Sequence, residues 1–145
     1  MPELNIAVLS AASIGVISVL LNPAYQITEI EFMLKKTGCK GIMILDNFKT
    51  LQHYDILNKI TQNQLEISKK GELSSKILPD LKHIILVKNK LVETNPDKYK
   101  GTWFHEEIEK CNNPFKTLPV VDMEDGFLMM FTVIKKNILI LDLYL

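Results

Sequence analysis

The side chains best suited to acid–base or metal chemistry are scattered along this sequence. His105-Glu106-Glu107-Ile108-Glu109 begins like the helix of a zinc protease, but Glu109 stands where the second histidine would be. His105 and Glu109, one helical turn apart, could still hold a metal ion as a pair, although exposed charge on an amphipathic helix explains the same pattern. His53 and His83 have no carboxylate partner at a useful spacing. Taken alone, these residues form no complete catalytic constellation.

The thiols and glycines also lack the spacing of a known site. Cys39 and Cys111 are the two cysteines, and neither belongs to a Cys-x-x-Cys motif, which argues against a disulfide framework or a four-cysteine zinc site. Each is expected to be a small buried apolar residue or a spectator rather than a nucleophile. Gly38 and Gly41 are present, but no Gly-x-Gly-x-x-Gly or Gly-x4-Gly-Lys-Ser/Thr loop follows any expected strand.

The overall charge argues against several classes of partner. The 17 basic residues balance the 17 acidic ones, so no net field attracts nucleic acid or an anionic membrane. Every basic residue is a lysine, which removes the planar guanidinium fork that grips phosphates and carboxylates in two places. With 145 residues, 47% of them hydrophobic, the chain is long enough for one domain with a buried core.

Four short apolar runs predict the strands of a mostly parallel sheet. These runs are continuous rather than alternating, which is typical of strands buried on both faces: Val16–Leu21, Ile42–Leu45, Ile84–Val87 and Phe127–Phe131. Helical segments separate most of them, so the expected fold class is α/β with flanking helices and right-handed crossovers. Within this scheme Trp103-Phe104 packs a helix onto the sheet, and Met129-Met130 belongs to the core.

Three helices are expected around this sheet, at Glu29–Thr37, Asn47–Ile60 and Phe104–Lys110. Thr28 and Glu31 have the spacing of a capping box for the first helix, and Gly38 supplies its stop. Residues 62–82 are polar and are expected to be an exposed loop or a poorly ordered excursion, and residues 88–101 a second such loop.

The apolar stretch Leu4–Leu21 contains no charge and lies at the lower limit of what spans a bilayer. Its polar residues and the lack of flanking lysines favour another reading, in which a buried helix breaks at Gly15 and a strand follows. Ile138–Leu145 is too short to span and carries Asp142. No stable membrane insertion is expected.

Several ordered blocks resemble one protein family. Gly15–Val19, Asn22–Gln26, Glu29–Phe32 and Leu34–Lys40 are similar to the AMP-forming acyl-CoA synthetases of the adenylate-forming superfamily, and most similar to the mitochondrial medium-chain acyl-CoA ligase branch. Three further blocks extend the match at similar spacing: Phe48–Thr50, Tyr54–Leu57 and Leu78–Leu81. The resemblance covers roughly Asn5–Thr132. Asn22 and Pro23 are expected to form a turn rather than a site.

This resemblance implies a partial amino-terminal domain of an adenylate-forming enzyme. Residues 1–132 would be the family segment and residues 133–145 a hydrophobic tail outside it. The intact family activates a fatty acid with ATP to an acyl-adenylate and transfers the acyl group to coenzyme A, with magnesium neutralising phosphate charge. For this chain alone no cofactor, no metal ligand and no nucleic acid partner are expected.

The sequence departs from the family pattern at Phe131-Thr132. In the family this strand end opens a phosphate-binding loop, so Thr132 would be the first residue of a truncated ATP loop and the one cofactor-binding candidate here. No glycine follows Gly126, and several backbone amides therefore cannot gather around a triphosphate. Lys135 and Lys136 are poor substitutes because they are flexible point charges in a β-branched run. The resemblance thus implies that the chain alone is catalytically inactive.

The same resemblance gives expectations about location and association. It implies a mitochondrial protein, or a cytoplasmic one if the missing amino terminus carries no transit peptide, since Met1 falls where the family's first helix is already under way. A partial domain leaves apolar surface uncovered, so self-association is expected. Two alternatives stay open: a short non-catalytic binding or regulatory protein, and a small membrane-anchored protein.

Overall fold

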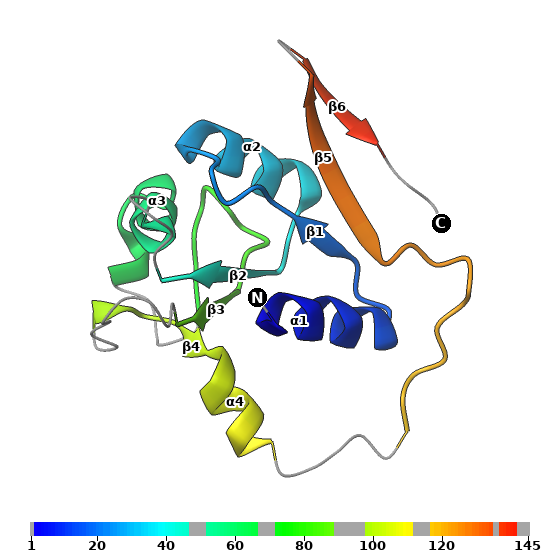
Figure 1. The fold of residues 1–145 in the computed structure, drawn as a ribbon. Coiled ribbons are helices and arrows are strands. Elements are labelled where there is room, and N and C mark those ends of the chain that lie inside the picture. The colour runs from blue at the N-terminus through cyan, green and yellow to red at the C-terminus, as the bar shows by residue number, and fades with distance from the viewer. Residues whose placement is uncertain are drawn as a thin grey trace. The chain divides into compact units, whose positions relative to one another are not determined.

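The chain folds into two compact units, which are described separately below (Figure 1). The first unit joins Met1–Asn22 to Asn113–Leu145, and the second unit is Pro23–Asn112. The computed structural model describes residues 2–46, 52–66, 72–88, 98–111, 117–134 and 137–141, with the backbone alone for 131–134 and 137–141.

The second unit contains a parallel sheet in the order β2-β3-β4. Strand β2 (Gly41–Leu45) pairs with β3 (His83–Val87), which pairs with the two-residue β4 (Thr102–Trp103). The expected strands Ile42–Leu45 and Ile84–Val87 are therefore confirmed, as is their parallel pairing. Strand β4 is too short to have an apolar run and was not predicted.

Helix α2 (Ile27–Thr37) follows from an apolar stripe and two terminal signals. Its Ile30, Met33 and Leu34 are buried, and Gly38 closes it in the left-handed conformation at φ 60°. The expected cap was wrong. The helix begins two residues earlier, with Gln26 as N-cap, and the Gln26 N–H donates to the Glu29 carboxylate at 3.1 Å. Glu31 instead pairs with Lys35.

Two further helices cover this sheet, and their lengths test the sequence prediction. Helix α4 (Phe104–Lys110) has the predicted bounds. Helix α3 is shorter than expected, His53–Ile60, because Gln52 is its extended N-cap. The predicted residues 47–51 lie outside the described part of the chain.

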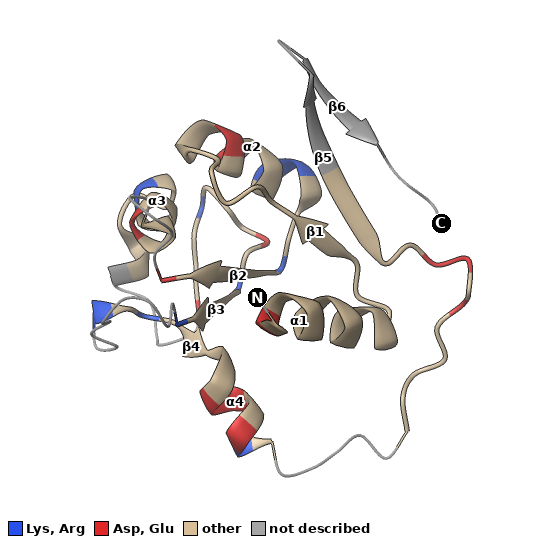
Figure 2. Ribbon diagram, viewed as in Figure 1, with Lys and Arg blue, Asp and Glu red and all other residues tan. Residues whose placement is uncertain are grey.

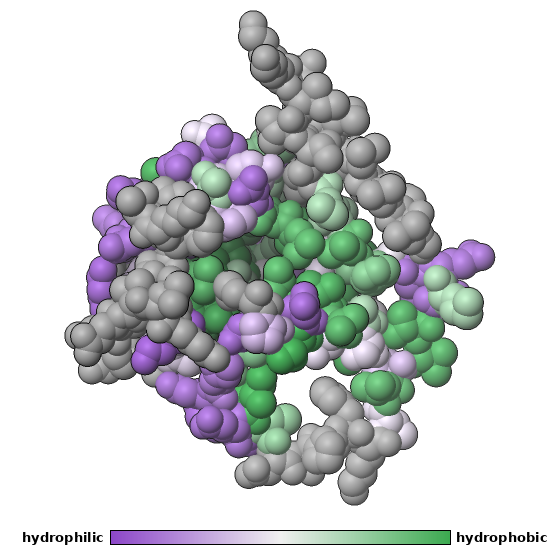
Figure 3. Space-filling view, in the orientation of Figure 1, coloured by the Kyte–Doolittle hydropathy of each residue, from purple (hydrophilic) through white to green (hydrophobic). Residues whose placement is uncertain are grey.

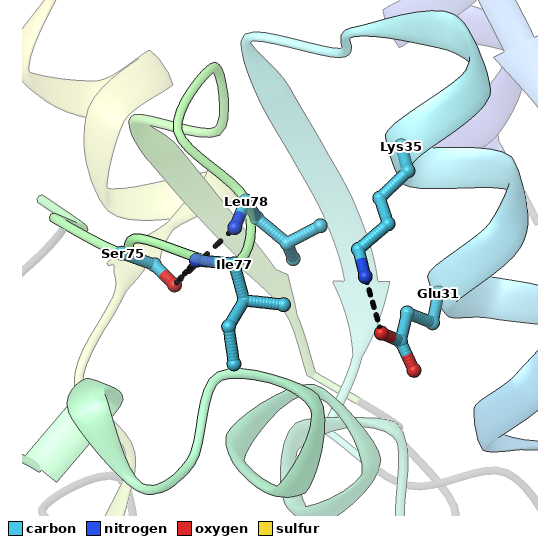
Figure 4. A network of polar contacts seen from close by, with 5 residues as sticks. All are labelled: Glu31, Lys35, Ser75, Ile77 and Leu78. Carbon is cyan, nitrogen blue, oxygen red and sulfur yellow. Dashed lines mark hydrogen bonds and ion pairs between the residues drawn. The ribbon is translucent and has the colours of Figure 1, made fainter.

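Residues 62–82 were expected to form an exposed loop, and in the residues that the structure describes this holds only in part, because exposed polar residues alternate with buried leucines. A short 3₁₀ helix, Gln64–Glu66, follows α3, and four leucines anchor the segment in the core of the second unit: Leu65, Leu73, Leu78 and Leu81. The Ser75 hydroxyl accepts hydrogen bonds from the backbone N–H of Ile77 at 3.2 Å and Leu78 at 3.4 Å (Figure 4). Isolated leucines in a polar stretch give no periodic signal, yet each one buries apolar area.

Residues 88–101 were also expected to be an exposed loop, and of these residues Lys88 and Lys98 are exposed. Tyr99 and Gly101 are buried, and residues 89–97 lie outside the described ranges. Trp103 is buried in the same core, as predicted for an aromatic residue that joins helix and sheet.

The first unit contains helix α1 (Pro2–Ser13) and a second sheet in the order β1-β5-β6. Strand β1 (Ser18–Leu20) is parallel to β5 (Leu128–Ile134), and β6 (Asn137–Leu141) is antiparallel to β5. The predicted helix, break and strand are confirmed, with Gly15 at φ 73°. Strand β1 is shorter than the predicted Val16–Leu21, and β5 runs past the predicted end at Phe131.

Two burial predictions in the first unit were wrong. Helix α1 was expected to be buried, but Leu4, Ile6 and Leu9 are exposed, and so is Met130 on β5. A continuous apolar run predicts a buried element only if other elements cover all its sides, and the run itself does not reveal that cover. Within the described ranges, no helix is long and apolar enough to cross a membrane.

Candidate functional site

The residue expected to contact ATP, Thr132, lies within strand β5 of the first unit. It is in register with Leu139 of β6, and β5 continues to Ile134. Thr132 therefore occupies a position between two paired residues of a hairpin, not the first position of a loop. Lys135 and Lys136 lie outside the described residues.

The acidic residues of α4 are used in surface ion pairs. Lys110 Nζ lies 3.0 Å from the Glu107 carboxylate and 3.8 Å from that of Glu106. The hydrogen bond that Lys110 donates to the Glu107 carboxylate is the main cause that raises the Lys110 pKa above its usual 10.5. His105 and Glu109 are exposed on the same helix. Among the side chains that the structure describes, no group of three or more could hold a metal ion.

The two remaining histidines occupy different positions in the second unit. His53, at the start of α3, has its Nε2 2.8 Å from the carbonyl oxygen of Pro23. This contact ties α3 to the turn at Pro23-Ala24, which includes the proline but not Asn22. His83 is exposed at the start of β3.

Both cysteines are free thiols in different environments. Cys39 is half-buried just after α2, and its Sγ lies 2.9 Å from the Thr37 hydroxyl, which itself donates to the Met33 carbonyl at 2.8 Å. Cys111 is exposed at the end of α4, so the buried role considered for it was wrong.

A small pocket of about 220 Å³ lies beside Cys39, between the end of α2 and the turn that precedes β3. Its wall is mainly apolar and is formed by Leu34, Leu78, Pro79 and Leu81. Three polar residues, Lys35, Cys39 and Asp80, complete it. Sequence reasoning missed this pocket, although Leu78–Leu81 is one of the blocks that carry the family resemblance.

The charges in the pocket wall already have neighbours. Lys35 Nζ lies 2.6 Å from the Glu31 carboxylate, one helical turn away (Figure 4). The Asp80 carboxylate lies over Gly38, 3.6 Å from where a Cβ would be. A paired lysine and an aspartate facing backbone do not make an acid–base pair, so the pocket can hold a small apolar group but offers no evident catalysis.

Aromatic and acidic side chains gather where β2 and β3 end. Asp46, directly after β2, is completely buried, and its backbone N–H donates to the Val87 carbonyl at 3.1 Å. The Tyr99 ring contacts Tyr54 edge-on at 5.0 Å between centroids and Trp103 at 6.2 Å. Burial raises the Tyr99 pKa above its usual 10.0, and the Asp46 and Asp55 charges add to this.

Such an edge is where open α/β sheets usually bind ligands. Here the groups on it mostly bind one another, since the Tyr54 hydroxyl accepts the Lys100 N–H at 2.9 Å. Buried Trp103 Nε1 has no hydrogen-bond partner within the described part of the chain. This edge therefore acts as an anchor for residues 98–103 in the core of the second unit.

Comparison with known proteins places these observations in a family context. A family model described as "AMP-binding enzyme" matches residues 1–133, which is nearly the whole chain.

Individual relatives agree with that match. The mitochondrial medium-chain acyl-CoA ligase of Rattus norvegicus is 37% identical over 123 residues, which is 85% of this chain and 18% of that protein. Those of Mus musculus and Homo sapiens are 48% and 44% identical over 79 residues, which is 54% of this chain and 13% of each protein. The chain thus spans less than a fifth of the length of these relatives.

Proposed function

Because the chain belongs to the AMP-binding enzyme family, we propose that it is part of an AMP-forming acyl-CoA ligase for medium-chain fatty acids. The observation that supports this most is that the family match runs through both units of the structure. The names of the relatives support the medium-chain substrate and a mitochondrial location.

In this proposal the intact enzyme performs an adenylyl transfer and then an acyl transfer. A carboxylate oxygen of the fatty acid attacks the α-phosphorus of ATP and releases pyrophosphate. The thiol of coenzyme A then loses its proton and attacks the acyl carbon, which releases AMP and forms the thioester. ATP, magnesium and coenzyme A are assigned to the intact enzyme, and no cofactor is assigned to this chain.

The chain itself is proposed to be inactive. Residues 1–132 are proposed to be the partial amino-terminal domain, and 133–145 a tail that does not belong to it. Stabilising the charge on transferring phosphates requires several donors held in place. Thr132 would contribute one hydroxyl, worth about 1 kcal/mol, whereas even millimolar affinity needs about 4 kcal/mol. Its position inside the β5–β6 hairpin supports this proposal, because paired backbone groups are not free to bind phosphate.

Two chimeras test the assignment. In the first, residues 1–132 replace the matching segment of the rat ligase, which then continues with its own sequence. In the second, the replacement runs to Leu145, so that the tail displaces the rat residues at that point. We expect the first chimera to form octanoyl-CoA from octanoate, ATP, magnesium and coenzyme A. The second should be at least about a hundredfold slower, because phosphate donors are lost.

Variants of the active chimera test the role of Thr132. Thr132→Ala should lower kcat/KM by about five- to tenfold, as expected for one hydrogen bond to a substrate. Thr28→Ala is the matched control, since Thr28 is an exposed helix residue, and it should change nothing. An inactive first chimera that is folded, or turnover by the 145-residue chain above a boiled control, would contradict the proposal.

We also propose that the free chain associates with itself through its exposed apolar side chains. Thirteen large apolar residues are exposed among those described, and such surfaces promote association. Light scattering after size-exclusion chromatography should show oligomers whose size grows with concentration. A monomer at every concentration would exclude this.

A further inference from the structure

The exposed apolar residues are concentrated in the first unit. Of the thirteen large ones in the described ranges, eleven belong to this unit, and Phe32 and Ile108 alone belong to the second. Six of the eleven lie in α1 and the turn after it: Leu4, Ile6, Leu9, Ile14, Val16 and Ile17. The face shown in Figure 3 has hydrophobic side chains gathered over α1 and β1.

Helix α1 is apolar on more than one side. Leu4 and Ile6 are 45% and 48% exposed, although at 100° per residue they point about 200° apart around the helix axis. Glu3 is the one charged residue in the helix (Figure 2). A helix that is apolar all round is a buried helix in a finished domain. By contrast, α2 buries one stripe and carries lysines and glutamates elsewhere.

The sheet of the first unit has an open edge at β1, the strand that follows α1 in the sequence. Strand β1 is first in the order and pairs with β5 on one side. No strand in the described part of the chain pairs with its other side. Unpaired backbone groups along such an edge are a template for another strand.

We propose that this surface, made of α1, the 14–17 turn and the free edge of β1, is the docking site for polypeptide of the same family from outside the matched segment. That polypeptide adds a strand beside β1 and packs apolar side chains around α1. This inference rests on the proposed ligase membership. The length of the relatives supports this occupant, since more than four-fifths of each lies outside the match. Glu3 is the one charged residue of α1 and is only 4% exposed, and so low an exposed charge fits the buried core of a protein interface.

Co-expression tests the inference with the full 145-residue chain. The probe is the rat ligase from which the matching segment has been deleted, and the chain carries a purification tag. We expect a 1:1 complex by light scattering in place of the chain's own oligomers. Hydrogen exchange should slow at the amides of β1 and α1 in the complex.

Two substitutions of exposed residues distinguish a specific docking site from non-specific hydrophobic association. Leu9→Asp, at a side chain 69% exposed on α1, should lower the yield of complex at least tenfold. Ile108→Asp is the matched control, because Ile108 is 48% exposed on α4 of the second unit, and it should leave the yield unchanged. Equal effects of the two changes would overturn the proposal. So would oligomers of the chain that persist beside an unbound or insoluble probe, which would indicate a second copy as the occupant.

The first chimera supplies a second measurement if the probe fails to fold. There Leu9→Asp should lower the melting temperature by several degrees, and Ile108→Asp should not. A Leu9→Asp chimera as stable as its parent would overturn the proposal. The readouts also separate the two hypotheses. If the complex or this stability pattern is observed but no acyl-CoA is formed, only the ligase assignment is contradicted. If the chimera is active but neither the complex nor the stability pattern is observed, only the docking surface is contradicted.

Discussion

At Gly101 an added methyl group would collide with the core of the second unit. A Cβ there would lie 2.7 Å from Leu86 Cδ1 and 3.2 Å from the Ile84 carbonyl oxygen, and Leu86 is completely buried. Gly101→Ala should therefore destabilise the second unit by about 1–3 kcal/mol through overpacking. Leu86→Ala alone should cost about 2–5 kcal/mol through a cavity.

The double variant tests whether the two effects share one contact. Removing the Leu86 side chain makes room for the new methyl group. The double variant should therefore lose less stability than the two single variants together, with a coupling energy of about 0.5–3 kcal/mol. Urea unfolding followed by fluorescence of Trp103, the single tryptophan, measures all four corners of the cycle. Strict additivity would mean that the clash is relieved elsewhere.

Tyr99 should make stability fall in alkaline solution. Its pKa is raised in the folded protein, first by burial and then by Asp46 and Asp55. The unfolded chain therefore loses this proton first, so the contribution to stability is complete below pH 10.0 and is lost as the pH rises through the folded value. Tyr99→Phe should flatten the stability profile above that pH. The same slope in both proteins would assign the alkaline loss to other groups.

At the scale of elements, α2 shows what a sequence pattern can and cannot locate. The stripe of Ile30, Met33 and Leu34 and the stop at Gly38 were predictable because both follow from helix geometry. The cap was not, because Gln26-Glu29 and Thr28-Glu31 have the same spacing and only the path of the preceding turn decides between them.

Two substitutions distinguish the observed cap from the expected one. Glu29→Ala removes the acceptor for the Gln26 N–H and an anion from the first turn, and should cost about 0.3–1 kcal/mol. Thr28→Ala should be neutral or slightly stabilising, because alanine has the higher helix propensity. Urea midpoints from Trp103 fluorescence give the comparison, and the reverse order would restore Thr28 as the cap.

Candidate-site residues were less predictable than strands, for a physical reason. A local run of apolar residues predicts a strand, as it does for β2 and β3. The pocket beside Cys39 combines α2 with a turn some forty residues later, and the Tyr54–Tyr99 contact joins segments about as far apart in the sequence. Such long-range contacts depend on tertiary packing, which the local periodicity of apolar residues does not predict.

At the scale of the whole molecule, the two units differ in how complete they are. The second unit has its own core of leucine, isoleucine and aromatic residues, and its backbone is continuous from Pro23 to Asn112. We therefore expect the fragment Pro23–Asn112 to fold alone. Its urea unfolding should be cooperative, and its midpoint should equal the one measured by Trp103 fluorescence in the full chain. A fragment with exposed Trp103 fluorescence would show that the first unit is needed for this core.

The register of β1 sets the order in which a ribosome allows the molecule to form. Strands β2 and β3 are both available once the chain has passed Val87, whereas Ser18 must wait for Leu128, more than a hundred residues later. At about 5–20 residues per second, that wait lasts roughly 5–20 s. Throughout that wait the apolar side chains of α1 lack the completed sheet of the first unit, so we expect chaperones to bind this segment during synthesis.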